Sequence, residues 1–123
     1  MKKSPLIFVI LVLLLGTVCL TNTFAVEVED EDLLVEPDPE NPFQGTWISK
    51  GIVTYIHVIK GMKGEWYVYS LDDRNWIKKA SYTIKPNSDG FVTSNNWKIS
   101  ITNDKNGEIL TVVKSKYKRY VHK

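Results

Sequence analysis

The sequence predicts an all-β protein, an antiparallel meander of six to eight strands that forms a small barrel. From residue 43 onward, β-branched and aromatic residues occur in short runs that are separated by turn residues. The turns recur about every 8–12 residues, which is typical of sandwiches and barrels. No window has a helical period long enough for a crossover helix, so a meander that closes on itself is favoured over βαβ units.

The strands can be placed from these runs and from the turns between them. Gly61-Met62-Lys63-Gly64 and Asn103–Gly107 are the plainest turns, because glycine and Asn-Gly adopt the backbone of tight hairpins. Residues 85–90, with the sequence KPNSDG, have the composition of a loop. Between the turns we expect strands at residues 47–50, 52–60, 65–71, 76–84, 91–94, 97–102, 108–114 and 116–122.

The first 25 residues have the order of a secretory signal peptide. Two lysines precede an apolar run over residues 6–15, and a more polar stretch ends in Thr23-Phe24-Ala25. This order predicts cleavage after Ala25. An uncleaved anchor is the alternative, although the apolar stretch is shorter than the roughly 20 residues of a membrane span. We therefore expect an exported protein that is periplasmic, held in the cell envelope or secreted.

Cys19 is the only cysteine of the chain. It follows the apolar run, as the acylated cysteine of a bacterial lipoprotein signal does, but Val18 before it is larger than the residue usual at that position. Lipidation at Cys19 is therefore the less favoured alternative to cleavage after Ala25. After that cleavage, the mature chain has no cysteine and folds without disulfides.

Charge divides the remaining chain into an acidic segment and a basic domain. Residues 26–42 hold eight acids, no base and three prolines, which bias the backbone to extended conformations. Residues 43–123 hold 14 Lys and Arg against six acids, a net charge of +8. We expect a disordered acidic linker over residues 26–42 and a β-barrel domain over residues 43–123. In the alternative, the acidic segment folds back on the basic domain and competes with an anionic partner.

The domain holds 12 of the 14 aromatic residues of the chain. Trp47, Trp76 and Trp97 each begin an expected strand, and at least two of them should point inward and fill a narrow barrel of six or seven paired strands. Side chains alternate along a strand, so the pairs Trp66/Val68 and Tyr67/Tyr69 face opposite sides. We expect little or no ligand cavity inside the barrel, and we expect any ligand at the barrel mouth or on the outer aromatic face of this strand.

The segment Asn41-Pro42-Phe43-Gln44-Gly45-Thr46-Trp47 resembles the opening of the lipocalin-like domains of small bacterial exported proteins. The matching element is Gly-x-Trp, here Gly45 and Trp47 on the first strand. In lipocalins this Trp plugs one end of the barrel, and a basic residue near the end of the chain packs over it. Arg119 is the residue here that matches that position. The resemblance implies an up-and-down barrel that binds a small apolar ligand.

The sequence gives little sign of catalysis. One Cys and two His exclude a Cys/His zinc site, a disulfide framework and an iron–sulfur cluster. The chain contains no Walker loop, G-x-G-x-x-G, H-E-x-x-H or G-x-S-x-G. His57 lies in an apolar strand, where a packed imidazole is commoner than a catalytic one, and Asp72-Asp73 is first of all a turn pair. We therefore expect no enzyme, no metal and no cofactor.

Two functions stay open. The first is an exported, non-catalytic binding module for a small apolar or amphipathic ligand. The second is a structural or protein-interaction module of the cell envelope, with a filled core and a basic aromatic surface. Nucleic acid is not an expected partner of an exported protein. The candidate surface residues are Trp66, Tyr67, Tyr69, Tyr117 and Tyr120, with Lys114, Lys116, Lys118, Arg119 and Lys123 as bases that could contact phosphates or an anionic membrane.

Overall fold

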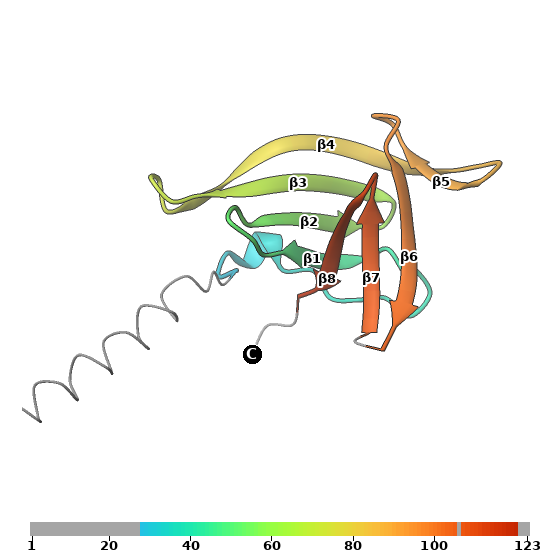
Figure 1. Cartoon of the computed structure of the whole chain (residues 1–123), viewed down its shortest axis with the longest axis horizontal. Helices are drawn as coiled ribbons and strands as arrows, with labels where there is room; N and C mark the ends of the chain where they lie inside the picture. Colours follow the sequence, from blue (N-terminus) through green and yellow to red (C-terminus); the bar gives the residue numbers. More distant parts are fainter. Residues whose placement is uncertain (1–27, 106, 121–123) are drawn as a thin grey trace, which may run out of the picture.

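The computed structural model describes residues 28–105 and 107–120. Within them, eight antiparallel strands follow one another around a closed barrel, and the last pairs with the first (Figure 1). The predicted meander of six to eight strands is thus confirmed; all eight strands are paired, where the expectation of a narrow interior rested on six or seven. The strands are β1 (Gly45–Ser49), β2 (Tyr55–Lys60), β3 (Lys63–Ser70), β4 (Asn75–Asn87), β5 (Gly90–Thr93), β6 (Lys98–Asp104), β7 (Gly107–Val112) and β8 (Ser115–Arg119).

Two segments differ most from the expected strands, and the other strand ends shift by three residues or fewer, as at Lys63 and Gly64, which were expected in a turn and belong to β3. Ile52 and Val53 belong to the β1–β2 loop and are exposed, although their β-branched side chains favour a strand. The loop-like segment from residue 85 instead continues β4 as far as Asn87, which pairs with Gly90. A tight turn makes this extension possible, since Asp89 N–H donates to Asn87 Oδ1 over 3.0 Å and Gly90 adopts a positive φ of 137°.

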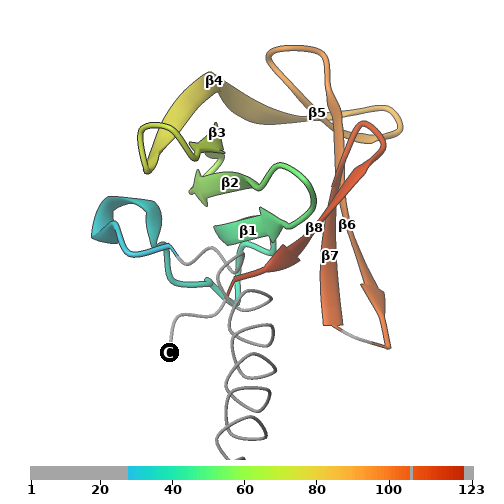
Figure 2. The ribbon, with the colours of Figure 1, turned by 60° about the vertical axis from the view of Figure 1, so that its left-hand side comes forward.

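The strands form two groups that cross, with β1 to β4 lying across Figure 1 and β6 to β8 running up it. Because the strands alternate in direction, the loops lie at two ends of the barrel. We call the end with residues 50–54, 71–74, 94–97 and 113–114 the mouth, and the opposite end the floor. Figure 2 shows the β1–β2 loop and the β7–β8 turn, both at the mouth, with the barrel turned by 60°.

The barrel interior is filled mainly by large side chains. Trp47 is completely buried there, and Trp97 packs against the same cluster, so the expectation of at least two inward tryptophans is confirmed. Trp76 instead packs on the outer surface. The buried interior residues are Phe43, Trp47, Ile59, Tyr82, Ile84, Ile99, Leu110, Val112 and Tyr117.

A second apolar cluster lies outside the barrel, on β1 and β2. Ile48, Ile56 and Val58 point away from the interior but are buried, because Val28 and Leu33 of the N-terminal segment cover them. Residues 28–35, which we call the strap, run beside these strands and include a short 3₁₀ helix, η1 (Glu31–Leu33) (Figure 2). The side chain of Asp30 caps this helix by accepting from Asp32 N–H.

Hydrogen bonds attach the strap to the barrel at both of its ends. The Thr46 hydroxyl donates to Leu33 O over 2.6 Å and accepts from Val35 N–H over 3.0 Å. Val28 N–H donates to the Tyr120 hydroxyl over 3.1 Å. Beyond the strap, the Gln44 amide donates to Glu36 O, and Asn41 Nδ2 donates to Gly61 O.

The expectation of an unpacked acidic linker is therefore wrong for residues 28–42. Most acids of this segment are exposed, while Val28 and Leu33 are buried on the barrel and Leu34 and Val35 are half-buried. The acid and proline content reflects the solvent-exposed residues of the segment. It does not show that the segment packs on an apolar face of β1 and β2. The expected signal segment, with Cys19, lies outside the described residues. Among residues 28–105 and 107–120, no helix is long and apolar enough to cross a membrane.

The strap should contribute measurably to stability. Leu33→Ala removes a side chain that is 4% exposed and leaves a cavity over Ile48 and Ile56. We expect the free energy of unfolding to fall by about 2–3 kcal/mol in urea denaturation. Glu29→Ala, a change at an exposed residue of the same segment, is the control and should change little. Equal unfolding midpoints for Leu33→Ala and the wild type would mean that the strap is not packed in solution.

Candidate functional site

The floor of the barrel is closed by Trp47 and Arg119. These residues face each other across the β1–β8 pair, and the guanidinium carbon lies 4.2 Å from the centre of the Trp47 ring. Arg119 Nη1 donates to Gln44 O over 2.7 Å, and Nη2 donates to Pro42 O over 3.1 Å. Arg119 Nε donates to Glu108 Oε1 over 3.0 Å, and Arg119 and Glu108 also form an ion pair through Nη2. One guanidinium therefore ties together β8, β7 and the residues that lead into β1.

Gly45 makes room for this arrangement. Its φ is +145°, in a region that L side chains rarely adopt, and a Cβ at this position would collide with Arg119 Nη1. The Trp47 indole N–H donates to Phe43 O over 2.9 Å, which fixes the ring across the floor. Gly45, Trp47 and Arg119, which the sequence joined through a family resemblance, thus lie together in the structure.

Above the floor, His57 stands inside a cage of aromatic rings. It is 1% exposed, and its Nδ1 forms a 2.7 Å hydrogen bond with the Tyr82 hydroxyl. Its ring stacks on Trp66 at 6.0 Å and meets Tyr117 edge-on at 4.6 Å. Tyr55 also stacks on Trp66, with ring centres 5.4 Å apart. The imidazole is therefore held by packing and by one hydrogen bond.

Burial fixes the charge of this cage. Desolvation lowers the pKa of His57 from 6.5 to about 3, so the imidazole is neutral at neutral pH. Burial also raises the pKa of Tyr82 well above its usual range, with a further rise from Tyr117. The pKa of Tyr117 is raised for the same reason, desolvation. All three groups are therefore uncharged at physiological pH.

A cavity of about 200 Å³ opens at the mouth, directly above this cage. Its lining is aromatic and aliphatic and comes from strands on opposite sides of the barrel. The lining residues are His57, Trp66, Trp97, Val112, Val113 and Tyr117. Trp97 forms one wall, because its ring packs edge-on against both Trp66 at 5.8 Å and Tyr82 at 5.7 Å.

Trp66, one of the lining residues, carries a buried polar atom that lacks a partner. Among the side chains of residues 28–105 and 107–120, its Nε1 is the buried nitrogen or oxygen without a hydrogen bond. The Tyr117 hydroxyl is close enough for the indole N–H to lower its pKa, but the pair does not reach hydrogen-bond geometry. A buried N–H without an acceptor costs free energy, and a ligand acceptor that reached this nitrogen would relieve that cost.

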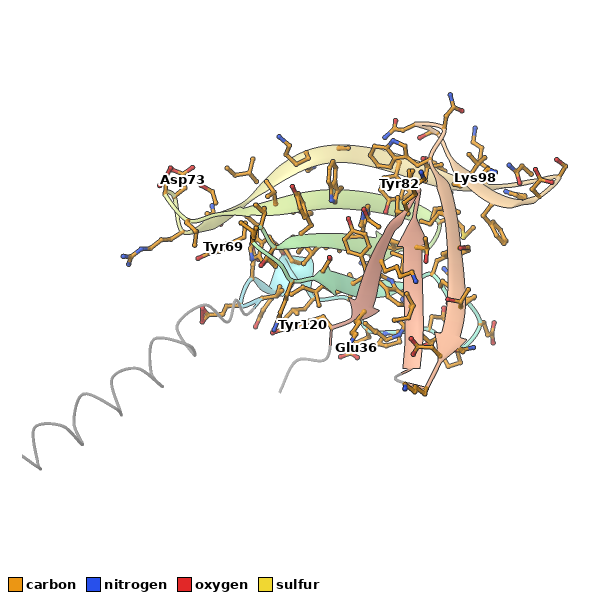
Figure 3. All side chains as sticks on the ribbon, viewed as in Figure 1. Glu36, Tyr69, Asp73, Tyr82, Lys98 and Tyr120 are labelled. Carbon is orange, nitrogen blue, oxygen red and sulfur yellow. The ribbon has the colours of Figure 1, made fainter. Side chains whose placement is uncertain are left out.

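The five aromatic residues of the expected surface do not share one face. Trp66 and Tyr117 belong to the interior, whereas Tyr67 and Tyr120 pack against the outer cluster under the strap. Tyr69 packs edge-on against Trp76 at 5.1 Å, and Figure 3 shows it toward the β3–β4 turn, far from Tyr82. Strand alternation explains the division, and the strap then covers much of the outer set.

The outer face of β3 carries a small polar network instead of a free aromatic surface. The Tyr67 hydroxyl donates to Glu65 Oε1 over 2.7 Å, and Lys78 Nζ lies 2.8 Å from Glu65 Oε2. The Lys78 hydrogen bond, followed by that of Tyr67, lowers the pKa of Glu65 below its usual value. Desolvation, the Glu65 hydrogen bond and the nearby charges of Asp30 and Asp32 raise the pKa of Tyr67.

Other features offer less to a ligand. A cavity of about 510 Å³ between the strap and β2 to β4 has a mixed lining that includes Asp32, Lys60, Lys63 and Glu65. A groove of about 440 Å³ runs beside Phe43 and Phe91. Asp72 and Asp73 lie in the β3–β4 turn, where Asp73 N–H donates to the Ser70 hydroxyl. In the described part of the chain, no group of three or more His, Cys, Asp or Glu could hold a metal ion.

Tyr82, Tyr55 and Gly64 are the site residues that the sequence did not single out. Gly64 lies opposite Tyr82 in the β3–β4 pair, and a Cβ there would collide with the Tyr82 ring. The glycine therefore gives Tyr82 the room to reach His57. A glycine in a hairpin next to an apolar strand is a weak signal for such close packing, since the turn explains it equally well.

Comparison with protein-family models, curated proteins and solved structures gives no match for this chain. The structure itself defines the class of the described domain: a small antiparallel barrel whose floor is closed by Trp47 and Arg119 and whose mouth is lined by aromatic side chains.

His57 predicts a specific pH dependence of stability. Its folded pKa of about 3 lies below the unfolded value of 6.5, so the unfolded chain binds the proton first as the pH falls. From pH 6.5 to pH 5, this linkage should lower the free energy of unfolding by about 1–2 kcal/mol. Carboxylates titrate mainly below that window.

His57→Gln, which keeps a polar partner for Tyr82, should flatten this slope. Urea denaturation of both proteins at several pH values measures the two slopes. Parallel slopes for the two proteins would contradict a buried neutral imidazole.

Proposed function

We propose that this chain is an exported, non-catalytic, lipocalin-like binding module that takes a small planar ligand in the cavity at its mouth. The observation that carries the proposal is the aromatic cavity of about 200 Å³, which is lined in part by Trp66, whose buried indole N–H has no partner. An apolar cavity with a few placed polar groups is the usual form of a small-molecule site.

The cavity indicates the chemistry of the ligand. Its volume is below the roughly 300 Å³ at which pockets for drug-sized molecules begin, so one ring or two fused rings is a suitable size. Aromatic walls favour a flat ligand that can stack, and the Trp66 N–H favours one with a hydrogen-bond acceptor. The neutral imidazole and tyrosines provide no counter-charge, so the ligand should be uncharged.

The same groups argue against catalysis by the cage. His57 has a pKa of about 3 and its Nδ1 is bonded to Tyr82, so it is a weak base at neutral pH. The hydroxyls around it have raised pKa values and are poor nucleophiles. Export is supported by the two N-terminal lysines, the apolar run and the Thr23-Phe24-Ala25 site of the sequence.

A second candidate is a structural or interaction module of the cell envelope. The filled lower interior favours it, because Trp47, Leu110 and Ile59 are completely buried there and leave a ligand only the space near the mouth. The two candidates differ in whether the mouth cavity binds anything.

Quinoline and naphthalene form a matched pair of probes for this cavity. They have the same shape, but only quinoline carries a nitrogen that accepts a hydrogen bond and is largely uncharged at pH 7. We expect quinoline to bind at a ratio of one to one in isothermal titration, about three- to tenfold more tightly than naphthalene.

Val112→Phe should abolish this binding by filling the cavity, whereas Ile77→Phe, the same kind of change at an exposed residue of β4, should leave it intact. Thermal melting shows that each variant is folded. Absence of binding to the folded wild type would favour the interaction module, and equal binding by both variants would place the ligand elsewhere.

A further inference from the structure

Two loops at the mouth of the barrel carry exposed aliphatic side chains at their tips. Ile52 and Val53 of the β1–β2 loop are 103% and 43% exposed, and Val113 of the β7–β8 turn is 57% exposed. β1 and β8 are paired, with Ile48 opposite Lys118, so these loops follow the same end of one strand pair (Figure 2). We call this set, with the lysines described below, the tip patch.

Both tips are presented by an ordered backbone. Val113 N–H donates to Lys98 O over 2.8 Å, which ties the β7–β8 turn to β6. Thr54, next to Val53, is buried, and its carbonyl accepts from Tyr69 N–H over 3.0 Å. The apolar side chains are thus held out from the barrel by anchored residues.

Val113 is also an unfavourable residue for the fold at this position. Its φ is +59°, in the left-handed region where a β-branched side chain is strained and where Asn or Gly is preferred in a two-residue hairpin turn. Val112 pairs with Ser115, so Val113 and Lys114 form that turn. An aliphatic side chain that is more than half exposed at a strained backbone position gains little from the fold, which points to a role outside it.

The charge around the tips has one sign. Lys50, Lys114 and Lys116 are exposed beside the three aliphatic residues. Neither residues 45–60 nor residues 109–123 contain an Asp or a Glu. Aliphatic tips surrounded by lysines match an anionic lipid surface, where the apolar groups enter the interfacial layer and the ammonium groups meet the headgroups.

We propose that the tip patch docks the mouth of the barrel onto an anionic membrane surface. Ile52, Val53 and Val113 insert at the level of the headgroups, and Lys50, Lys114 and Lys116 contact lipid phosphates. The β3–β4 turn stays in water, because Asp72 and Asp73 at its tip are repelled by such a surface (Figure 3).

This docking sets the mouth cavity toward the bilayer, since Val113 belongs both to the tip patch and to the cavity wall. An uncharged planar ligand could then pass between lipid and cavity without crossing bulk water. Docking itself does not depend on the cavity holding a ligand. Amide exchange of the two loops therefore tests docking independently of ligand binding.

The test is millisecond hydrogen exchange of the full chain with vesicles, read peptide by peptide. Vesicles of phosphatidylcholine with phosphatidylglycerol are compared with vesicles of phosphatidylcholine alone, which control for any attachment through the apolar N-terminal residues. We expect amides of residues 50–54 and 113–116 to exchange about tenfold more slowly on the anionic vesicles only. The protection should fade at about 1 M salt, where charge interactions are screened within roughly 3 Å.

Two single variants and one control define the footprint. Ile52→Ser and Val113→Asn should each remove the protection, and Val113→Asn should fold at least as stably as the wild type, because Asn tolerates the positive φ. Met62→Ser is the matched control, since Met62 is an exposed apolar residue between Lys60 and Lys63 at the floor. It should leave the protection unchanged.

Three results would overturn the proposal. These are equal exchange of both loops on the two kinds of vesicle, protection that Val113→Asn and Ile52→Ser do not change, and protection of residues 61–62 or 71–74 in place of the tip patch.

Discussion

Closure of the barrel between its first and last strands is the constraint on which the rest of the structure depends. The ladder between β1 and β8 registers only Trp47 with Arg119 and Ile48 with Lys118, extended by the bond from Tyr120 N–H to Thr46 O. Arg119 reinforces this short seam through Trp47, Gln44 O, Pro42 O and Glu108. With the seam closed, both strands lose their free edges and the interior is sealed at the floor.

Closure also decides what happens outside the barrel. β1 and β2 contribute Trp47, His57 and Ile59 to the interior, and Ile48, Ile56 and Val58 to the outer face. A barrel of this size cannot cover the outer face with its own strands, so the strap does so with Val28 and Leu33. The strap and the seam meet at Tyr120, whose hydroxyl accepts from Val28 N–H and whose own N–H bonds to β1.

The division between floor and mouth follows from the sizes of the inward residues. Near the floor, Trp47 and its hydrogen bond to Phe43 O fill the cross-section. Near the mouth, the rings of Trp66, Trp97 and Tyr117 stand around a neutral imidazole and leave a cavity. The aromatic residues thus both fill the core and form the walls of the candidate site, which explains why so small a domain contains so many of them.

Strand runs and turn residues predicted the meander, since period-two patterns and Asn-Gly turns are local signals. Packing between distant segments could not be predicted in this way. Val28 and Leu33 look like isolated apolar residues in an acidic stretch, and only the unpaired face of β1 and β2 explains their burial.

The cage around His57 is equally non-local. It depends on Gly64 leaving room for Tyr82, which comes from another strand. The β-branched run from Ile52 predicted a strand where the β1–β2 loop lies. Composition cannot separate the two, because a strand and an exposed apolar loop can have the same residues.

A double-mutant cycle between Trp47 and Arg119 tests the central role of the seam most directly. The free energies of unfolding of the wild type, Trp47→Leu, Arg119→Met and the double variant would be measured in urea. Because the guanidinium lies over the ring and is largely shielded from solvent, the account predicts a coupling energy of about 1–2 kcal/mol. A coupling within about 0.3 kcal/mol of zero would mean that the two residues stabilise the barrel independently, and would contradict closure through their contact.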